Sequence, residues 1–271
     1  MGLSSNILWH QTNYNSLRKI LKGKRLLCAY SVEDVADMTG QNLAFPMVSM
    51  CDLPLSEFTE FQGKYDHYSI GLSREWGSKN KFTPIWYYEA KSRVPQMLRR
   101  EILNAANNKS DSITSLIGIL SYMKKVEGPL PKHNYSTYRF YDEREVRFVP
   151  SFEYVLRGGD KPFLTETEYA DYKATNGSPV INAYVAFDWS DVRYIIVKEK
   201  HQIEKIISDL DTLGCDNRQI GVFCEDEIYQ DVIGYRHNVE IPVPAVVPMA
   251  EEIKDKIVQS LLEKIAEVMG I

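Results

Sequence analysis

The sequence predicts one α+β domain over residues 1–271, on the strength of two alternating kinds of pattern. Short apolar runs that are typical of strands occur at residues 45–51, 67–72 and 84–88, close enough together to imply a sheet. Segments with apolar residues at spacings of three and four, which indicate amphipathic helices, interrupt and follow these runs. A chain of this length can bury one large mixed core.

The order of elements follows from the caps and breaks along the chain. A strand at residues 7–9 leads into a helix that begins after Asn13 and ends at Gly23. Helices are expected as an insertion over about residues 92–127, and a final helix over about residues 249–269. The remaining predictions are a helix after Thr165, one helix at residues 202–213, and strands at residues 139–149, 183–187, 193–197 and 220–224.

Composition and charge exclude several classes of function. A formal net charge of −5 argues against coating nucleic acid through bulk electrostatics, although a local basic patch stays open. The N-terminus lacks the features of a signal peptide and no membrane-length apolar run occurs, so a cytoplasmic location is expected. The four cysteines show no CxxC spacing, which favours buried free thiols over disulfides or metal ligands: Cys28, Cys51, Cys215 and Cys224. The five histidines are scattered, and no metal is expected.

The first candidate site is the segment His10-Gln-Thr12. Side chains two apart on an extended segment point to the same side, so the imidazole and the hydroxyl could bind one polar ligand such as a ribose. The junction of a strand with a helix is also a favoured place for ligand-binding groups. A core histidine with its hydrogen bonds satisfied is the alternative.

The second candidate site is the segment at residues 140–150. If this segment is extended, Glu143, Glu145 and Arg147 share one face, and the two carboxylates repel unless a cation or a ligand hydroxyl lies between them. Such a pair could stabilise an oxocarbenium-like centre or accept a hydroxyl proton, whereas the alternative is a ladder of surface charges. Tyr68 could offer its ring to a flat heterocycle, with a core tyrosine as the alternative.

Four phrases together resemble a known family: LxHxT, PMVSMCDLPLSEF, HYSIGLSREW and FYDEREVRFVP. In this order they resemble the AbiGi family of bacterial abortive-infection (phage-resistance) proteins, well over residues 7–155 and more weakly beyond, through RYIIV and VFCEDEIYQDVI. Met50 and Val146 stand where the family pattern leads one to expect aromatic residues. The family is described as the antitoxin half of a toxin–antitoxin pair, which implies a partner toxin protein.

The order of His-x-Thr, an aromatic strand and a Glu strand also resembles the ADP-ribosyltransferases, in particular their DarT-like and RNA 2′-phosphotransferase-like branches. This resemblance implies a split mixed or antiparallel sheet, with flanking and inserted helices, that clamps NAD. It also implies one role for each residue that matches the pattern. His10 and Thr12 would hold the adenosine-side ribose, Tyr68 would stack on nicotinamide, Glu145 would bond the nicotinamide ribose, and Glu143 would orient the acceptor.

Two functions follow from these resemblances. The leading hypothesis is a phage-defence enzyme that moves ADP-ribose from NAD to an RNA or other nucleic-acid acceptor, or to a protein acceptor. The alternative is a non-catalytic antitoxin that neutralises a partner toxin or regulates transcription, the latter being disfavoured because no helix-turn-helix signature is present. The enzyme requires that His10, Thr12, Tyr68 and Glu145 surround one cleft.

Overall fold

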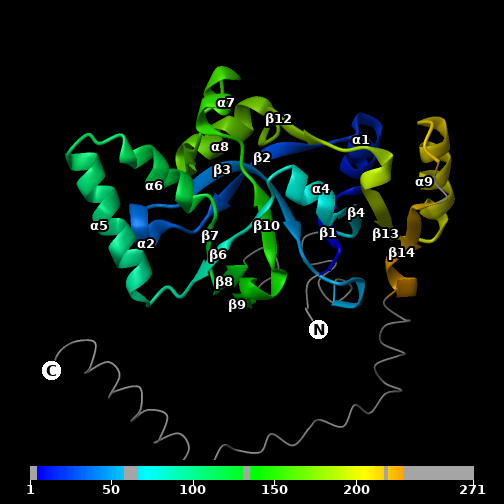
Figure 1. Cartoon of the computed structure of the whole chain (residues 1–271), viewed down its shortest axis with the longest axis horizontal. Helices are drawn as coiled ribbons and strands as arrows, with labels where there is room; N and C mark the ends of the chain where they lie inside the picture. Colours follow the sequence, from blue (N-terminus) through cyan, green and yellow to red (C-terminus); the bar gives the residue numbers. More distant parts are fainter. Residues whose placement is uncertain (1–4, 58–65, 131–134, 217–218, 229–271) are drawn as a thin grey trace, which may run out of the picture. The chain divides into compact units, whose positions relative to one another are not determined.

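The computed structural model describes residues 5–57, 66–130, 135–216 and 219–228 (Figure 1). The chain divides into two units, residues 1–232 and 233–271, and all the described elements belong to the first. The helix predicted over residues 249–269 lies outside the described residues.

A mostly antiparallel sheet confirms the predicted α+β class. Its main path runs in the order β12 (Val180–Ala186), β2 (Arg25–Glu33), β3 (Leu43–Cys51), β1 (Ile7–Thr12), β4 (Tyr68–Ser73), β13 (Val192–Val197) and β14 (Gly221–Cys224). Off this path, β10 (Glu145–Phe148) and β11 (Leu164–Thr165) also pair with β3, and β5 (Thr83–Pro84) pairs with β10. The pair β13 and β14 is parallel, while the other pairs of this sheet are antiparallel.

Two small ribbons and several helices complete the described part. The ribbons are parallel β6 (Trp86–Tyr88) with β7 (Met123–Lys125), and antiparallel β8 (Glu127–Leu130) with β9 (Tyr135–Arg139). The helices are α1 (Tyr14–Gly23), α2 (Ala36–Thr39), α4 (Arg74–Lys79), α5 (Arg93–Asn107), α6 (Ser112–Leu120), α7 (Phe152–Arg157), α8 (Glu166–Asn176) and α9 (His201–Thr212). Figure 1 shows α5 and α6 near α2, and α9 beside β13 and β14.

The side chains of β2 alternate between the main core and the opposite face of the sheet. Its even-numbered residues Leu26, Cys28 and Tyr30 are buried in the main core, which α1 joins through Leu17 and Leu21. Its odd-numbered residues face the opposite side, because successive side chains of a strand point to opposite faces. The four cysteines are free thiols, as predicted, and Cys28, Cys215 and Cys224 are buried while Cys51 is half-buried.

The strand β3 creates an opening beside β1 and β2. It pairs with β2 from Leu43 to Met47, but it meets β1 only at Cys51. The strands β1 and β2, which α1 connects, pair with β3 at different positions. They diverge between Met47 and Cys51. Ser49 lies at this divergence.

One strand prediction is wrong in its extent. The segment predicted as a strand over residues 139–149 is instead the end of β9, a 3-10 turn at Phe140–Glu143, and the short strand β10. Arg144 adopts a left-handed conformation, with φ 45°, which an extended strand cannot contain. Glu143 therefore precedes the strand, and only Glu145 and Arg147 share a strand face.

Candidate functional site

A cavity of about 860 Å³ lies against the diverging strands and is called the central cavity below. Its walls come from β1, α1, β2 and β3, and its charged end from Lys124, Glu143 and Glu145. The alternate residues of β2 from Arg25 to Glu33 run along it. This volume is in the range of small-molecule and cofactor sites.

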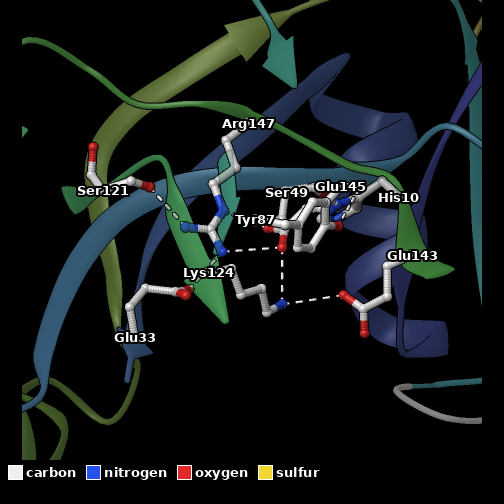
Figure 2. A network of polar contacts seen from close by, with 9 residues as sticks. All are labelled: His10, Glu33, Ser49, Tyr87, Ser121, Lys124, Glu143, Glu145 and Arg147. Atoms are coloured by element: carbon white, nitrogen blue, oxygen red, sulfur yellow. Dashed lines mark hydrogen bonds and ion pairs between the residues drawn. The ribbon is translucent and has the colours of Figure 1, made fainter. Parts of the chain in front are cut away.

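Four of the five predicted site residues line the central cavity: His10, Thr12, Glu143 and Glu145. His10 and Thr12 come from β1, whereas Glu143 and Glu145 come from the 3-10 turn and β10, far along the chain. Figure 2 shows His10 and the two glutamates in the same region. The fold thus brings the His-x-Thr segment and the acidic pair to one hollow.

Tyr68 is placed elsewhere. It pairs with Thr12 across β1 and β4, yet within the described part of the chain it does not belong to the cavity wall. Its hydroxyl accepts a hydrogen bond from Nε2 of Gln202 at 3.0 Å, and its ring packs on that of Tyr14 with 5.3 Å between centroids. These contacts fit the alternative reading of Tyr68 as a packed tyrosine.

His10 is held as a neutral imidazole. Its Nδ1 lies 3.0 Å from the carbonyl oxygen of Ser49, and because a carbonyl can only accept, Nδ1 carries the proton. Burial lowers the pKa of His10, although the bond to Ser49 opposes this shift. Nε2 is therefore the acceptor nitrogen, suited to a ligand hydroxyl.

Arg147 is the buried cation that holds the carboxylates at the charged end of the cavity. It is fully buried and binds Glu145 through two hydrogen bonds, Nε to Oε1 at 2.6 Å and Nη2 to Oε2 at 3.0 Å. Its guanidinium also contacts Glu33 at 2.9 Å and donates from Nη1 to the carbonyl of Ser121 at 2.7 Å. The two hydrogen bonds from Arg147 to Glu145 fix the plane of the Glu145 carboxylate.

Lys124 lies between the two carboxylates (Figure 2). Its Nζ is 3.1 Å from Oε2 of Glu143 and 2.9 Å from Oε2 of Glu145, and it sits 4.7 Å from the ring centroid of Phe140. The acidic pair is buried, with 2% of Glu143 and 4% of Glu145 exposed. Lys124 thus supplies the cation that two neighbouring carboxylates require.

Burial and the neighbouring charges shift the pKa values of this cluster in opposite directions. Burial by itself would raise the pKa of Glu145, but the charges of Arg147 and Lys124 outweigh burial and hold that pKa well below its usual range. Burial raises the pKa of Glu33, and the Arg147 charge opposes this only in part. Burial and the nearby glutamates raise the pKa of Cys51, so its thiol stays neutral. Glu145 is therefore the stable anion of the site.

Sequence reasoning missed several members of this cluster. Neither Glu33 nor Lys124 was among the predicted site residues, because both come from segments distant from the two candidate sites. Arg147 was expected on one face with Glu143 and Glu145, but its burial and its contacts with Glu33 and Ser121 were not predicted. Tyr87 was also missed: its hydroxyl accepts from the backbone N–H of Glu145 at 2.9 Å.

Within residues 5–57, 66–130, 135–216 and 219–228, no three His, Cys, Asp or Glu side chains are grouped to hold a metal ion. No helix in these ranges is both long enough and apolar enough to span a bilayer.

The charged cavity belongs to a chain with relatives among phage-resistance proteins. A family model described as "Putative abortive phage resistance protein AbiGi, antitoxin" matches residues 24–198, more than half of the sequence. The chain therefore belongs to the AbiGi family, which confirms the predicted resemblance and supports a role in phage defence.

A curated relative supports the same assignment. The protein named "Abortive phage resistance protein AbiGi" from Lactococcus lactis subsp. cremoris is 27% identical over 191 residues, covering 60% of this chain and 75% of that protein. No solved structure matches this chain significantly. The family match includes Glu33, Lys124 and the segment 143–147, whereas His10 and Thr12 precede it. It also extends beyond residue 155, where the motifs had become weak.

Proposed function

We propose that this protein acts in abortive phage defence by binding NAD in the central cavity and transferring ADP-ribose to a nucleic-acid or protein acceptor. The observation that carries the proposal is the convergence of His10, Thr12, Glu143 and Glu145 on one cavity of about 860 Å³. A neutral histidine whose Nε2 is the acceptor nitrogen, beside a hydroxyl, suits the vicinal hydroxyls of a ribose. The divergence of β1 and β2 supports the split sheet that this class of enzyme uses.

Glu145 is the catalytic carboxylate in this proposal. Cleavage of the bond between nicotinamide and ribose builds positive charge at the anomeric carbon, and a fixed anion stabilises that charge without reorganising. The two bonds from Arg147 supply the fixed orientation, and the lowered pKa keeps Glu145 ionised. Glu143 orients the acceptor nucleophile from the adjoining turn.

The cations limit how the reaction can proceed. A carboxylate offers about four lone-pair positions; Arg147 and Lys124 engage three on Glu145, and the Ser49 side chain donates a further hydrogen bond to it. A ligand hydroxyl therefore displaces Lys124 or Ser49, since Arg147 is fully buried. Tyr68 lies away from the cavity wall and is given no contact with NAD.

The test is transfer of label from NAD. Purified full-length protein is incubated with adenylate-labelled NAD and cell extract, and nicotinamide release is measured in parallel. The proposal expects both signals in the wild type and their loss in Glu145→Gln, which removes the charge at constant shape. Glu153→Gln is the matched control, because Glu153 is an exposed glutamate on α7. Equal signals in the two variants would exclude Glu145 as the catalytic group.

A second candidate function is a non-catalytic antitoxin that neutralises a cognate toxin protein. The observation that favours it is the neutralisation of both carboxylates by buried or half-buried cations, together with the word antitoxin in the family description. This candidate expects no nicotinamide release. It also expects that expression of the chain protects cells from the product of a neighbouring gene, and that Glu145→Gln protects equally well.

A further inference from the structure

The segment at residues 18–25 concentrates positive charge in an otherwise acidic chain. It holds five basic residues within a protein of net charge −5: Arg18, Lys19, Lys22, Lys24 and Arg25. Arg18 is bound to Asp209 at 2.6 Å, and Lys24 lies 3.8 Å from Asp188. Lys19 and Arg25 instead line the central cavity, and neither forms an ion pair with any residue that the structure describes.

Lys19 and Arg25 converge on the same part of the cavity wall. Ser16, Lys19, Ile20 and Gly23 all line the cavity, at the spacing of one helix face. Arg25 packs against the end of this face, since its Cγ lies 3.4 Å from the position a Cβ on Gly23 would take. Its guanidinium stacks on Tyr184 at 5.0 Å, which leaves its in-plane N–H groups available.

This basic end is far from the carboxylates. Arg25 and Glu33 are the first and last residues of β2, and eight residue steps at about 3.3 Å each make about 26 Å. Glu33 shares the guanidinium of Arg147 with Glu145, so it marks the acidic end. In NAD the diphosphate is attached directly to the ribose that Glu145 would bind, and so it lies too close to Glu145 to reach Lys19 and Arg25.

The basic end follows Thr12 in the chain, whereas His10 lies toward Glu145, because His10 and Glu145 both contact Ser49. Thr12 ends β1 and Lys19 lies on the second turn of the helix that follows, about 8 Å along its axis from Tyr14. An anionic group on the outer side of the adenosine-side ribose would meet an ammonium and a guanidinium, and among the described residues the carboxylates that line the cavity are those of its acidic end, Glu33, Glu143 and Glu145.

We propose that Lys19 and Arg25 form a subsite for a phosphate on the adenosine-side ribose, so that the cavity selects a 2′-phosphorylated dinucleotide, NADP, over NAD. This inference rests on the proposed function and specifies its substrate. The two molecules differ by one phosphate group, and charge-assisted hydrogen bonds from an ammonium and a guanidinium distinguish them.

The test is calorimetric titration of the full-length protein with NADP, NAD and 2′-AMP. We expect NADP to bind roughly tenfold or more tightly than NAD, because each charge-assisted hydrogen bond contributes about that factor. Lys19→Gln combined with Arg25→Gln removes this preference and the binding of 2′-AMP, while NAD binding stays unchanged. Lys22→Gln is the matched control, an exposed lysine on α1 outside the cavity wall, and it retains the preference.

Three results would overturn the inference. Equal affinities of the wild type for NAD and NADP exclude a phosphate-reading subsite and leave NAD binding intact. A preference for NADP that survives the double substitution shows that Lys19 and Arg25 do not bind the phosphate. A preference that Lys22→Gln also abolishes shows that it depends on the total charge of the segment. Failure of the wild type to bind either dinucleotide overturns the proposed function itself, and the subsite with it. Lys19 and Arg25 are exposed, so a thermal melt is expected to show that the double variant folds.

Discussion

Replacing Arg147 by Met is expected to destabilise the protein by about 4 kcal/mol at pH 7. Arg147 has no solvent exposure and neutralises two buried carboxylates, those of Glu33 and Glu145. Removing the cation leaves both charges buried without their main partner, and breaking a buried pair in this way typically costs about 3–5 kcal/mol. The loss of the bond to the Ser121 carbonyl adds to this cost.

The assay is urea unfolding followed by circular dichroism. Arg157→Met is the matched control, because Arg157 is 80% exposed in its side chain and pairs with Glu153 one turn away. We expect a change below about 0.5 kcal/mol for that control. Adding Glu33→Gln and Glu145→Gln to Arg147→Met is expected to restore part of the stability, because the stranded charges are then gone. An Arg147→Met variant as stable as Arg157→Met would refute the account of the buried cluster.

Three further outcomes are expected. Folding lowers the pKa of Glu145, so in acid the folded state binds fewer protons than the unfolded state. The difference in unfolding free energy between wild type and Glu145→Gln should therefore be largest at pH 7 and shrink as the pH falls below about 4.3. A difference that grows in acid would contradict the lowered pKa. Gly71→Ala should cost about 1–3 kcal/mol in urea unfolding, because the new Cβ would lie 2.9 Å from Ile7 Cγ2 and Trp9 Cζ3; a neutral result would show that these side chains can move. Tyr68→Phe should cost about 1 kcal/mol through the lost bond to Gln202 and leave NAD binding unchanged; weakened binding would return Tyr68 to the site.

Local patterns sufficed to predict the parts of the fold that local physics determines. The helix α1 begins after Asn13, whose side chain accepts from the backbone N–H of Ser16, and both the cap and the apolar spacing are visible in the sequence. His10 and Thr12 lie on one side of β1, as alternation along a strand predicts, and both line the cavity together with Trp9 and Gln11. The broken strand at residues 139–149 was not predictable, because nothing in the residue type of Arg144 indicates a left-handed backbone.

The site could be predicted only in part, because its electrostatics depend on distant segments. The acidic pair was visible as a motif, and so was its need for a cation, but Lys124 comes from β7 and Glu33 from β2. The contacts of Tyr68 depend on distant segments in the same way. This tyrosine lies beside Thr12 in register, yet which of its neighbours it packs against depends on α1 and α9, which the sequence does not position.

Histidine side-chain NMR during NAD titration tests whether a dinucleotide binds beside His10. We expect NAD to shift the Nε2 resonance of His10, and the pKa of His10 to lie below its ordinary value of 6.5 before NAD is added. His201 is the internal control, since its side chain is 74% exposed on α9. An unchanged His10 signal at saturating NAD, or equal shifts in His10 and His201, would contradict the account.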